Sequence, residues 1–163
     1  MATNVQISGP QAGAKGPLPV LVVDDSKAQR RVLALQLQRW GYQVTEASSG
    51  EEALDACRTT PFEMVLSDWM MPGMTGLDFC KQFRALPRDG YGYFILLTSK
   101  SEKTEIADGL ENGADDFLTK QAPKADLIAA VHRALVGALH RAGCSLDRAV
   151  QACARTTPAG RPT

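Results

Sequence analysis

Short strand-like runs alternate with helix-period segments along most of the chain, and this alternation restricts the possible folds more than any other feature. Five such runs are found, at residues 19–23, 43–47, 62–67, 93–98 and 116–118. The first is continuously apolar and ends at Asp24, which suits a strand buried on both faces of a sheet. The pattern predicts a doubly wound α/β fold, with a five-stranded parallel sheet in the flavodoxin-like order 2-1-3-4-5 and five helices.

Helix start and stop signals fall between these runs. Ser26 is a suitable N-cap for a first helix that ends at Gly41, and Pro123 is a favoured first residue of the last helix. The other helices are expected at residues 50–58, 76–85 and 102–111. Apolar residues recur near helical spacing in the first helix (Val32, Leu33, Leu35, Leu37, Trp40) and in the last (Leu127, Ile128, Val131, Leu135, Ala138).

The composition fits one globular domain: the chain has 163 residues, of which 44% are hydrophobic and 22% are charged. We expect this domain at residues 18–141, with a flexible leader at 1–17 and a poorly ordered tail at 142–163. Lysine plus arginine (18) balances aspartate plus glutamate (18), so no overall positive field favours direct binding to nucleic acid or to an anionic membrane.

The apolar runs are too short to cross a bilayer of roughly 30 Å, and the first residues lack a secretory signal. These features predict a soluble, cytoplasmic protein. Four cysteines without a Cys-x-x-Cys spacing are expected to be free thiols, namely Cys57, Cys80, Cys144 and Cys153. His132 and His140 are eight residues apart on one helix, which is too far for the usual metal pair, so we expect solvated histidines.

Polar side chains lie at the carboxyl ends of four of the expected strands. In chain order they are Asp24 and Asp25, then Asp68, then Thr98 and Ser99, and finally Lys120. In a parallel sheet of this order the carboxyl ends of the strands meet at one crevice. Three carboxylates brought together there repel one another unless a cation joins them. Oxygen ligands suit Mg²⁺, and Asp25 and Asp68 are the expected direct ligands. Lys120 and Thr98 could then stabilise a transferring phosphoryl group, which leaves Asp68 as the nucleophile that forms an aspartyl phosphate.

The sequence resembles the response-regulator receiver family over residues 19–139. Four segments in the same order carry the resemblance, at residues 22–26, 67–76, 96–99 and 113–120. The resemblance implies that Asp68 is the phosphoacceptor, that Asp24 and Asp25 hold Mg²⁺, and that the backbone carbonyl of Met70 also coordinates the ion. It implies that Thr98 and Phe117 are a switch pair that reports phosphorylation to the face formed by the last two helices and the last strand.

The same resemblance implies the partners and the limits of the activity. The phosphoryl donor is a histidine kinase or a phosphotransfer protein, and the chain catalyses only its own phosphorylation and dephosphorylation. About twenty residues follow the last helix, whereas a typical output domain needs at least ~50. The output is therefore either contact with a downstream protein or an output domain in a longer regulator of which this chain is the amino-terminal piece.

Three positions bear on the rates at which Asp68 is phosphorylated and dephosphorylated. The family resemblance implies that Met70 and Lys100 flank the path of the hydrolytic water. Neither side chain can orient that water or act as a base, so slow self-dephosphorylation is expected. Family members usually have a proline after the residue matching Lys120, whereas this chain has Gln121. We therefore expect a trans bond between Lys120 and Gln121, with Lys120 still within ion-pair reach of Asp68.

Other interpretations compete with this one. Haloacid-dehalogenase enzymes also use an aspartate nucleophile, Mg²⁺ and a lysine, but their motif is Asp-x-Asp after the first strand, not the adjacent Asp24 and Asp25 found here. A receiver that no longer responds to phosphate is disfavoured by the complete Asp, Thr and Lys set. A flavin site is disfavoured because the loop after residue 23 is acidic rather than rich in glycine.

Simpler structural roles compete residue by residue. Asp25 alone is more often a turn former than a ligand, and only its combination with Asp68 and Lys120 reverses that preference. The thioethers of Met70, Met71 and Met74 favour copper, and because no other residue does, we interpret them as loop packing. Phe117 alone is more often a strand or core residue than a switch, so its switch role rests on the resemblance.

Overall fold

The computed structural model describes residues 18–87, 91–99, 107, 109–120 and 123–141, and it contains one five-stranded parallel sheet. The strands are β1 (Pro19–Val23), β2 (Gln43–Ala47), β3 (Met64–Asp68), β4 (Tyr93–Thr98) and β5 (Asp116–Thr119). Their order is β2-β1-β3-β4-β5, and every neighbouring pair is parallel. The predicted fold class and strand order are confirmed.

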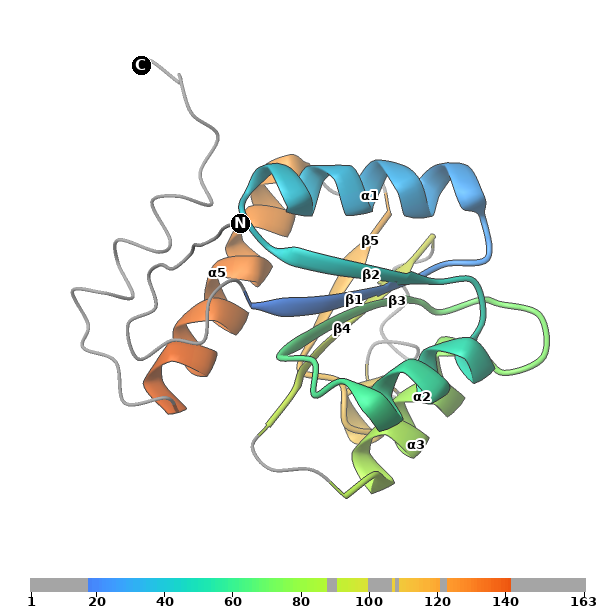
Figure 1. Ribbon diagram of the computed structural model, residues 1–163. Coiled ribbons are helices and arrows are strands. Elements are labelled where there is room, and N and C mark those ends of the chain that lie inside the picture. The colour runs from blue at the N-terminus through green and yellow to red at the C-terminus, as the bar shows by residue number, and fades with distance from the viewer. Residues whose placement is uncertain (1–17, 88–90, 100–106, 108, 121–122, 142–163) are drawn as a thin grey trace, which may run out of the picture.

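Helices cover both faces of this sheet, as Figure 1 shows. They are α1 (Lys27–Arg39), α2 (Gly50–Thr59), α3 (Gly76–Ala85) and α5 (Lys124–Arg141). The helix predicted at 102–111 is helical at the described residues 107 and 109–111, and its other residues lie outside the described part of the chain. Ser26 caps α1 as expected, because its hydroxyl accepts a hydrogen bond from the backbone N–H of Gln29.

The strand residues alternate between two hydrophobic cores, one on each face of the sheet. On β1, Val20 and Val22 pack in a core with α1 and α5, whereas Leu21 and Val23 pack in a core with α2 and α3. All four side chains are fully buried. Successive side chains of a strand point to opposite faces, so a strand covered on both faces must be apolar throughout.

The apolar pattern of α1 is only partly buried. Leu37 and Trp40 belong to the core beneath the helix, but Val32 is 70% exposed and Leu35 is 44% exposed. A helix that packs on one side buries only one stripe of its surface, and the five apolar residues predicted for this helix cover a wider arc than that stripe. The exposed pair therefore contributes little to the core.

The third strand begins and ends later than predicted, at Met64 and Asp68 instead of residues 62 and 67. Phe62 is buried in the core, but its backbone N–H donates to the carbonyl of Thr60 in a turn instead of joining the sheet. Hydrophobicity alone therefore misplaced the strand start. The later end means that Asp68 itself is paired in the sheet, opposite Leu97 of β4.

The first residue of α3 lies directly against the end of β3. The backbone N–H of Gly76 donates to the carbonyl of Trp69 at 2.8 Å. A Cβ atom on Gly76 would lie 2.1 Å from the carbonyl oxygen of Asp68 and 3.0 Å from the Cα of Trp69. Only glycine allows this approach. Thr75 then begins the helix with a capping box that includes Asp78.

The leader expected at 1–17 and the tail expected at 142–163 lie outside the described residues. Within the described part of the chain, no helix is both long enough and apolar enough to cross a membrane.

Candidate functional site

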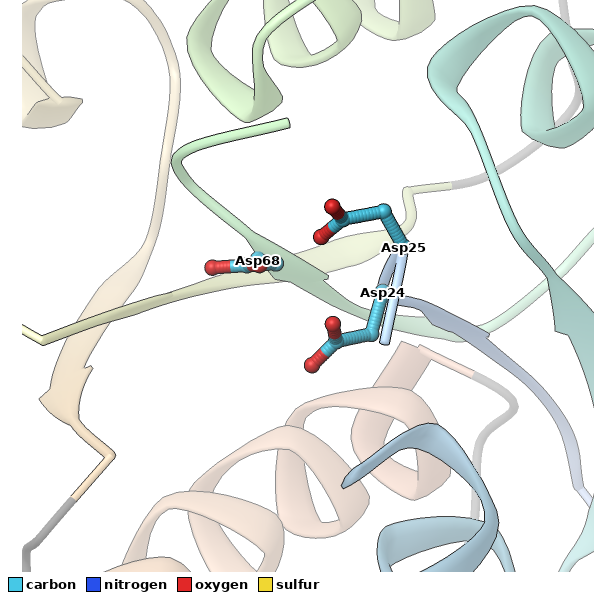
Figure 2. A group of neighbouring side chains, drawn as sticks. All are labelled: Asp24, Asp25 and Asp68. Carbon is cyan, nitrogen blue, oxygen red and sulfur yellow. The ribbon is translucent and has the colours of Figure 1, made fainter. Parts of the chain in front are cut away.

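The carboxyl ends of β1 and β3 bring three aspartates together. Asp24 and Asp25 follow β1, and Asp68 is the last residue of β3; Figure 2 shows their carboxyl groups extending in the same general direction. Each aspartate offers a carboxylate oxygen, and these oxygens lie within 4.8 Å of one another. Asp24 and Asp68 are 4% and 5% exposed, whereas Asp25 is exposed to solvent. The grouping expected from the sequence is therefore present.

The turn that carries Asp24 is fixed from two sides. The Oδ1 of Asp24 accepts a hydrogen bond from the backbone N–H of Ser26 at 2.8 Å. The guanidinium of Arg30 donates to the carbonyl oxygen of Asp24 at 2.8 Å, and its Nε pairs with the Oε1 of Glu46 at 3.1 Å. Arg30 thus links α1 and the end of β2 to the turn, a role that no motif in the sequence indicated.

Lys120 follows β5 and reaches the buried carboxylates. Its Nζ lies 3.1 Å from the Oδ2 of Asp68 and 3.2 Å from the Oδ2 of Asp24. Its backbone N–H donates to the carbonyl of Thr98 at 2.6 Å, which ties the end of β5 to the end of β4. The expected ion-pair reach between Lys120 and Asp68 is confirmed. Gln121 lies outside the described residues, so the trans bond expected before it stays a prediction.

Burial is the main electrostatic influence on Asp68. The pKa of this carboxyl is raised from 3.8 to about 6: burial is the largest cause, the nearby charges of Asp24 and Asp25 act in the same direction, and Lys120 opposes them. Burial also lowers the pKa of Lys120, but its contacts with Asp68 and Asp24 outweigh burial and leave that pKa raised. The site is therefore a cluster of acidic groups with too little positive charge to balance it.

This donor set fits a hard divalent cation. Carboxylate oxygens are the ligands that Mg²⁺ prefers, and the three available here come from two different strands. The raised pKa of Asp68 reflects a site where ionisation is costly unless a further cation shares the charge. We conclude that Asp24, Asp25 and Asp68 could hold Mg²⁺.

In protein free of divalent metal, we expect Asp68→Asn to increase the free energy of unfolding, and to do so more at pH 8 than at pH 4.5. Because the folded pKa of about 6 exceeds the ordinary 3.8, the wild type loses stability as pH rises through this interval. Asparagine keeps the shape but cannot ionise. The expected gain at pH 8 is about 1 to 3 kcal/mol, measured by urea denaturation in EDTA. An equal gain at both pH values would contradict the assigned cause.

The two expected switch residues lie on adjacent strands. Thr98 ends β4 and is 2% exposed, and it pairs in register with Thr119 of β5. Phe117 is half-buried and packs edge to face on Trp69, with ring centroids 5.7 Å apart and an interplanar angle of 80°. Since Trp69 directly follows Asp68, this ring contact connects the acidic cluster to β5.

A groove of about 860 Å³ opens beside the acidic cluster, and Asp24, Asp68, Met70 and Lys120 are among its lining residues. Met70 is 63% exposed at this edge. Coordination of Mg²⁺ by the backbone carbonyl of Met70 stays a prediction. Lys100, the second residue expected to tune hydrolysis, lies outside the described residues.

The histidines and cysteines correspond only partly to expectation. His132 is half-buried, and among the described side chains its Nε2 is a buried polar atom without a hydrogen-bond partner, so the prediction of a solvated histidine was wrong for it. The helical position alone could not reveal which way the ring points. Cys57 and Cys80 are thiols and are not joined in a disulfide within the described part of the chain, as predicted, and burial raises the pKa of Cys80 to about 11. Cys144, Cys153 and the side chain of His140 lie outside the described part.

Comparisons with known proteins agree with this geometry. A family model described as the response regulator receiver domain matches residues 20–132. The chain is 35% identical over 116 residues to the DNA-binding response regulator MtrA of Mycobacterium tuberculosis, which covers 71% of this chain and 50% of MtrA. It is 38% identical over 104 residues to the transcriptional regulatory protein ResD of Bacillus subtilis, which covers 62% of this chain and 41% of ResD. The chain spans about half the length of the curated relatives it matches.

Solved structures show the same likeness over their whole length. The chemotaxis protein CheY4 of Vibrio cholerae is 32% identical, with a TM-score of 0.70 over 74% of this chain and 100% of CheY4. A response regulator receiver protein from Pseudomonas putida is 27% identical, with a TM-score of 0.67 over 74% of this chain and 99% of that protein.

Proposed function

Because the chain belongs to the response regulator receiver domain family, we propose that it is a phosphorylation-activated switch in which Asp68 accepts the phosphoryl group. Proteins of this family are in general phosphoacceptors and not enzymes that turn over an external substrate. The observation that carries the proposal is the position of Asp68, which lies within 4.8 Å of two further carboxylates and 3.1 Å from the ammonium of Lys120. The donor in this proposal is a histidine kinase or a phosphotransfer protein in the cytoplasm.

The chain's own residues divide the chemistry between them. A carboxylate oxygen of Asp68 forms a bond to phosphorus while the bond from phosphorus to the donor's leaving group breaks. Lys120 stabilises the negative charge on the phosphoryl oxygens, and the hydroxyl of Thr98 donates a hydrogen bond to one of them. Mg²⁺, held by Asp24, Asp25, Asp68 and the carbonyl of Met70, would supply further neutralisation of that charge.

A direct experiment tests this proposal without knowledge of the kinase. The protein is incubated with acetyl phosphate and Mg²⁺, and its intact mass is measured. The expected result is the gain of one phosphoryl group, located on Asp68. Phosphorylation at another residue, or none at all, would exclude Asp68 as the phosphoacceptor.

We infer that the output is a change on the face formed by α5, β5 and the helix that contains residues 109–111. The contact of Phe117 with Trp69 supports this route, because it joins the residue after Asp68 to β5. Phosphate must interact differently with two states of the protein in order to shift their populations. The face then binds a downstream protein, or it contacts an output domain elsewhere in a longer regulator.

Phosphorylation should change the backbone amide chemical shifts of Phe117 and of residues on that face, as well as those beside Asp68. A Thr98→Ala variant should keep the shifts beside Asp68 but reduce those at Phe117, because it removes the hydroxyl that responds to the phosphoryl group. Two-dimensional amide spectra of both proteins, with and without acetyl phosphate, measure this. Wild-type shifts confined to the phosphorylation site would count against the switch.

The aspartyl phosphate should be long-lived, because neither Met70 nor Lys100 can orient or activate the attacking water. Met70 is 63% exposed at the groove, so a polar side chain at this position can reach solvent there. Replacing the pair by Met70→Asn with Lys100→Glu should shorten the lifetime by about tenfold or more. The decay of the phosphorylated mass after removal of acetyl phosphate measures it. An unchanged lifetime would assign control to another group.

A further inference from the structure

Among the described residues, three side-chain oxygens lie close to the ammonium of Lys120, as many as its N–H bonds. Two of them are the Oδ2 atoms of Asp68 and Asp24, at 3.1 Å and 3.2 Å. The third is the side-chain Oε1 of Gln29, at 2.5 Å, on the first turn of α1. The first two acceptors belong to the group of carboxylates that fits a cation, whereas Gln29 is a neutral amide outside that group.

The position of Gln29 is tied to the same group through the cap of α1. The hydroxyl of Ser26 accepts a hydrogen bond from the backbone N–H of Gln29 at 3.4 Å, and the backbone N–H of Ser26 donates to the Oδ1 of Asp24 at 2.8 Å. Lys120 donates to the Oδ2 of the same aspartate. These contacts close a ring that runs through Asp24, Ser26, Gln29 and Lys120. The ring determines the side from which Gln29 reaches the ammonium.

The charges show why a third acceptor matters. A lysine ammonium is a point charge on a flexible four-carbon stem, so its position depends on the partners that hold it. A cation or a phosphoryl group that engages Asp24 and Asp68 weakens their attraction for Lys120, because the carboxylate charge is then shared. The amide oxygen of Gln29 keeps its full acceptor capacity in that state. The side chain of Gln29 belongs to the groove that opens beside Asp68.

We propose that Gln29 is a positioning residue, which holds the Lys120 ammonium beside Asp68 while the carboxylates are engaged elsewhere. This inference rests on the proposed function of Asp68. It assigns to α1 a part in the chemistry in addition to its packing on the sheet.

The test uses Gln29→Met, which keeps an unbranched side chain of similar length and helix propensity but removes the strong acceptor. Gln36→Met is the matched control: Gln36 lines the same groove about 10 Å further along the axis of α1. With acetyl phosphate and Mg²⁺, the phosphorylation rate of Gln29→Met should fall by about three- to tenfold. Gln36→Met should remain within about twofold of the wild type.

A second readout requires neither phosphate nor Mg²⁺. In the metal-free protein, nitrogen–proton spectra of the Lys120 ammonium should show a shifted or broadened signal in Gln29→Met, because one of its three acceptors is lost. Gln29→Glu, which retains an oxygen acceptor, should preserve the narrow signal. A wild-type rate and an unaltered Lys120 signal in Gln29→Met would overturn the inference, as would an equal loss of rate in Gln36→Met. If the wild type itself is not phosphorylated on Asp68, the proposed function fails instead, and the metal-free spectra still show whether Gln29 holds the lysine.

Discussion

The Asp68→Asn protein is expected to gain no phosphoryl group under conditions that phosphorylate the wild type completely. Asparagine has nearly the same shape, but its amide is not a nucleophile that can form an acyl phosphate. Asp24 and Asp68 both pair with Lys120, at 3.2 Å and 3.1 Å, and Asp68 is the one that ends the central strand β3. Intact mass measurement after incubation with acetyl phosphate and Mg²⁺ shows the result directly.

A matched carboxylate provides the control for this experiment. Asp55 on α2 has a side chain that is 76% exposed and pairs with Arg58, so Asp55→Asn should be phosphorylated at the wild-type rate. EDTA should abolish phosphorylation of the wild type, because three clustered carboxylates and an anionic donor repel one another without a cation. A phosphorylated Asp68→Asn protein would contradict the proposed function. Full phosphorylation of the wild type in EDTA would show that the reaction does not need a divalent metal.

The Gly76→Ala protein is expected to lose about 3 kcal/mol or more of its free energy of unfolding. The added Cβ would lie 2.1 Å from the carbonyl oxygen of Asp68, and this obstacle is backbone, which cannot turn away as a side chain can. Either α3 or the end of β3 must move. Because Asp68 lies at that end, we also expect phosphorylation to slow by at least tenfold in whatever protein remains folded. Urea denaturation and the phosphorylation rate measure the two effects.

Gly41→Ala distinguishes this clash from the general cost of replacing a glycine. Gly41 has a φ of +96°, and apart from its two chain neighbours no described residue has an atom within 4 Å of the position that its Cβ would take. Alanine there carries only the conformational strain, about 1 to 2 kcal/mol, and should leave the phosphorylation rate unchanged. If the two variants lose equal stability, the close approach of Gly76 to Asp68 is not what makes glycine necessary.

The order of the elements was predictable because it depends on local patterns. An apolar run that ends in Asp24 and Asp25 identifies a buried strand and its polar end, and the same argument applies to Asp68. Lys120 follows a shorter strand, which the alternation of strands and helices still identifies. Parallel topology then requires these ends to meet, so the acidic cluster follows from alternation and strand order alone. The sequence by itself therefore determined the fold class, the location of the site and its charged members.

Only the tertiary structure decided which further polar side chains complete that site. In the sequence, Gln29 and Arg30 are ordinary polar residues of a helical turn, yet Gln29 contacts Lys120 and Arg30 donates to the carbonyl of Asp24. The burial of the His132 ring and the exposure of Val32 were decided in the same way. Periodicity tells which residues share a helix face, but the rotation of a helix against the sheet and the reach of long side chains depend on packing between segments distant in sequence.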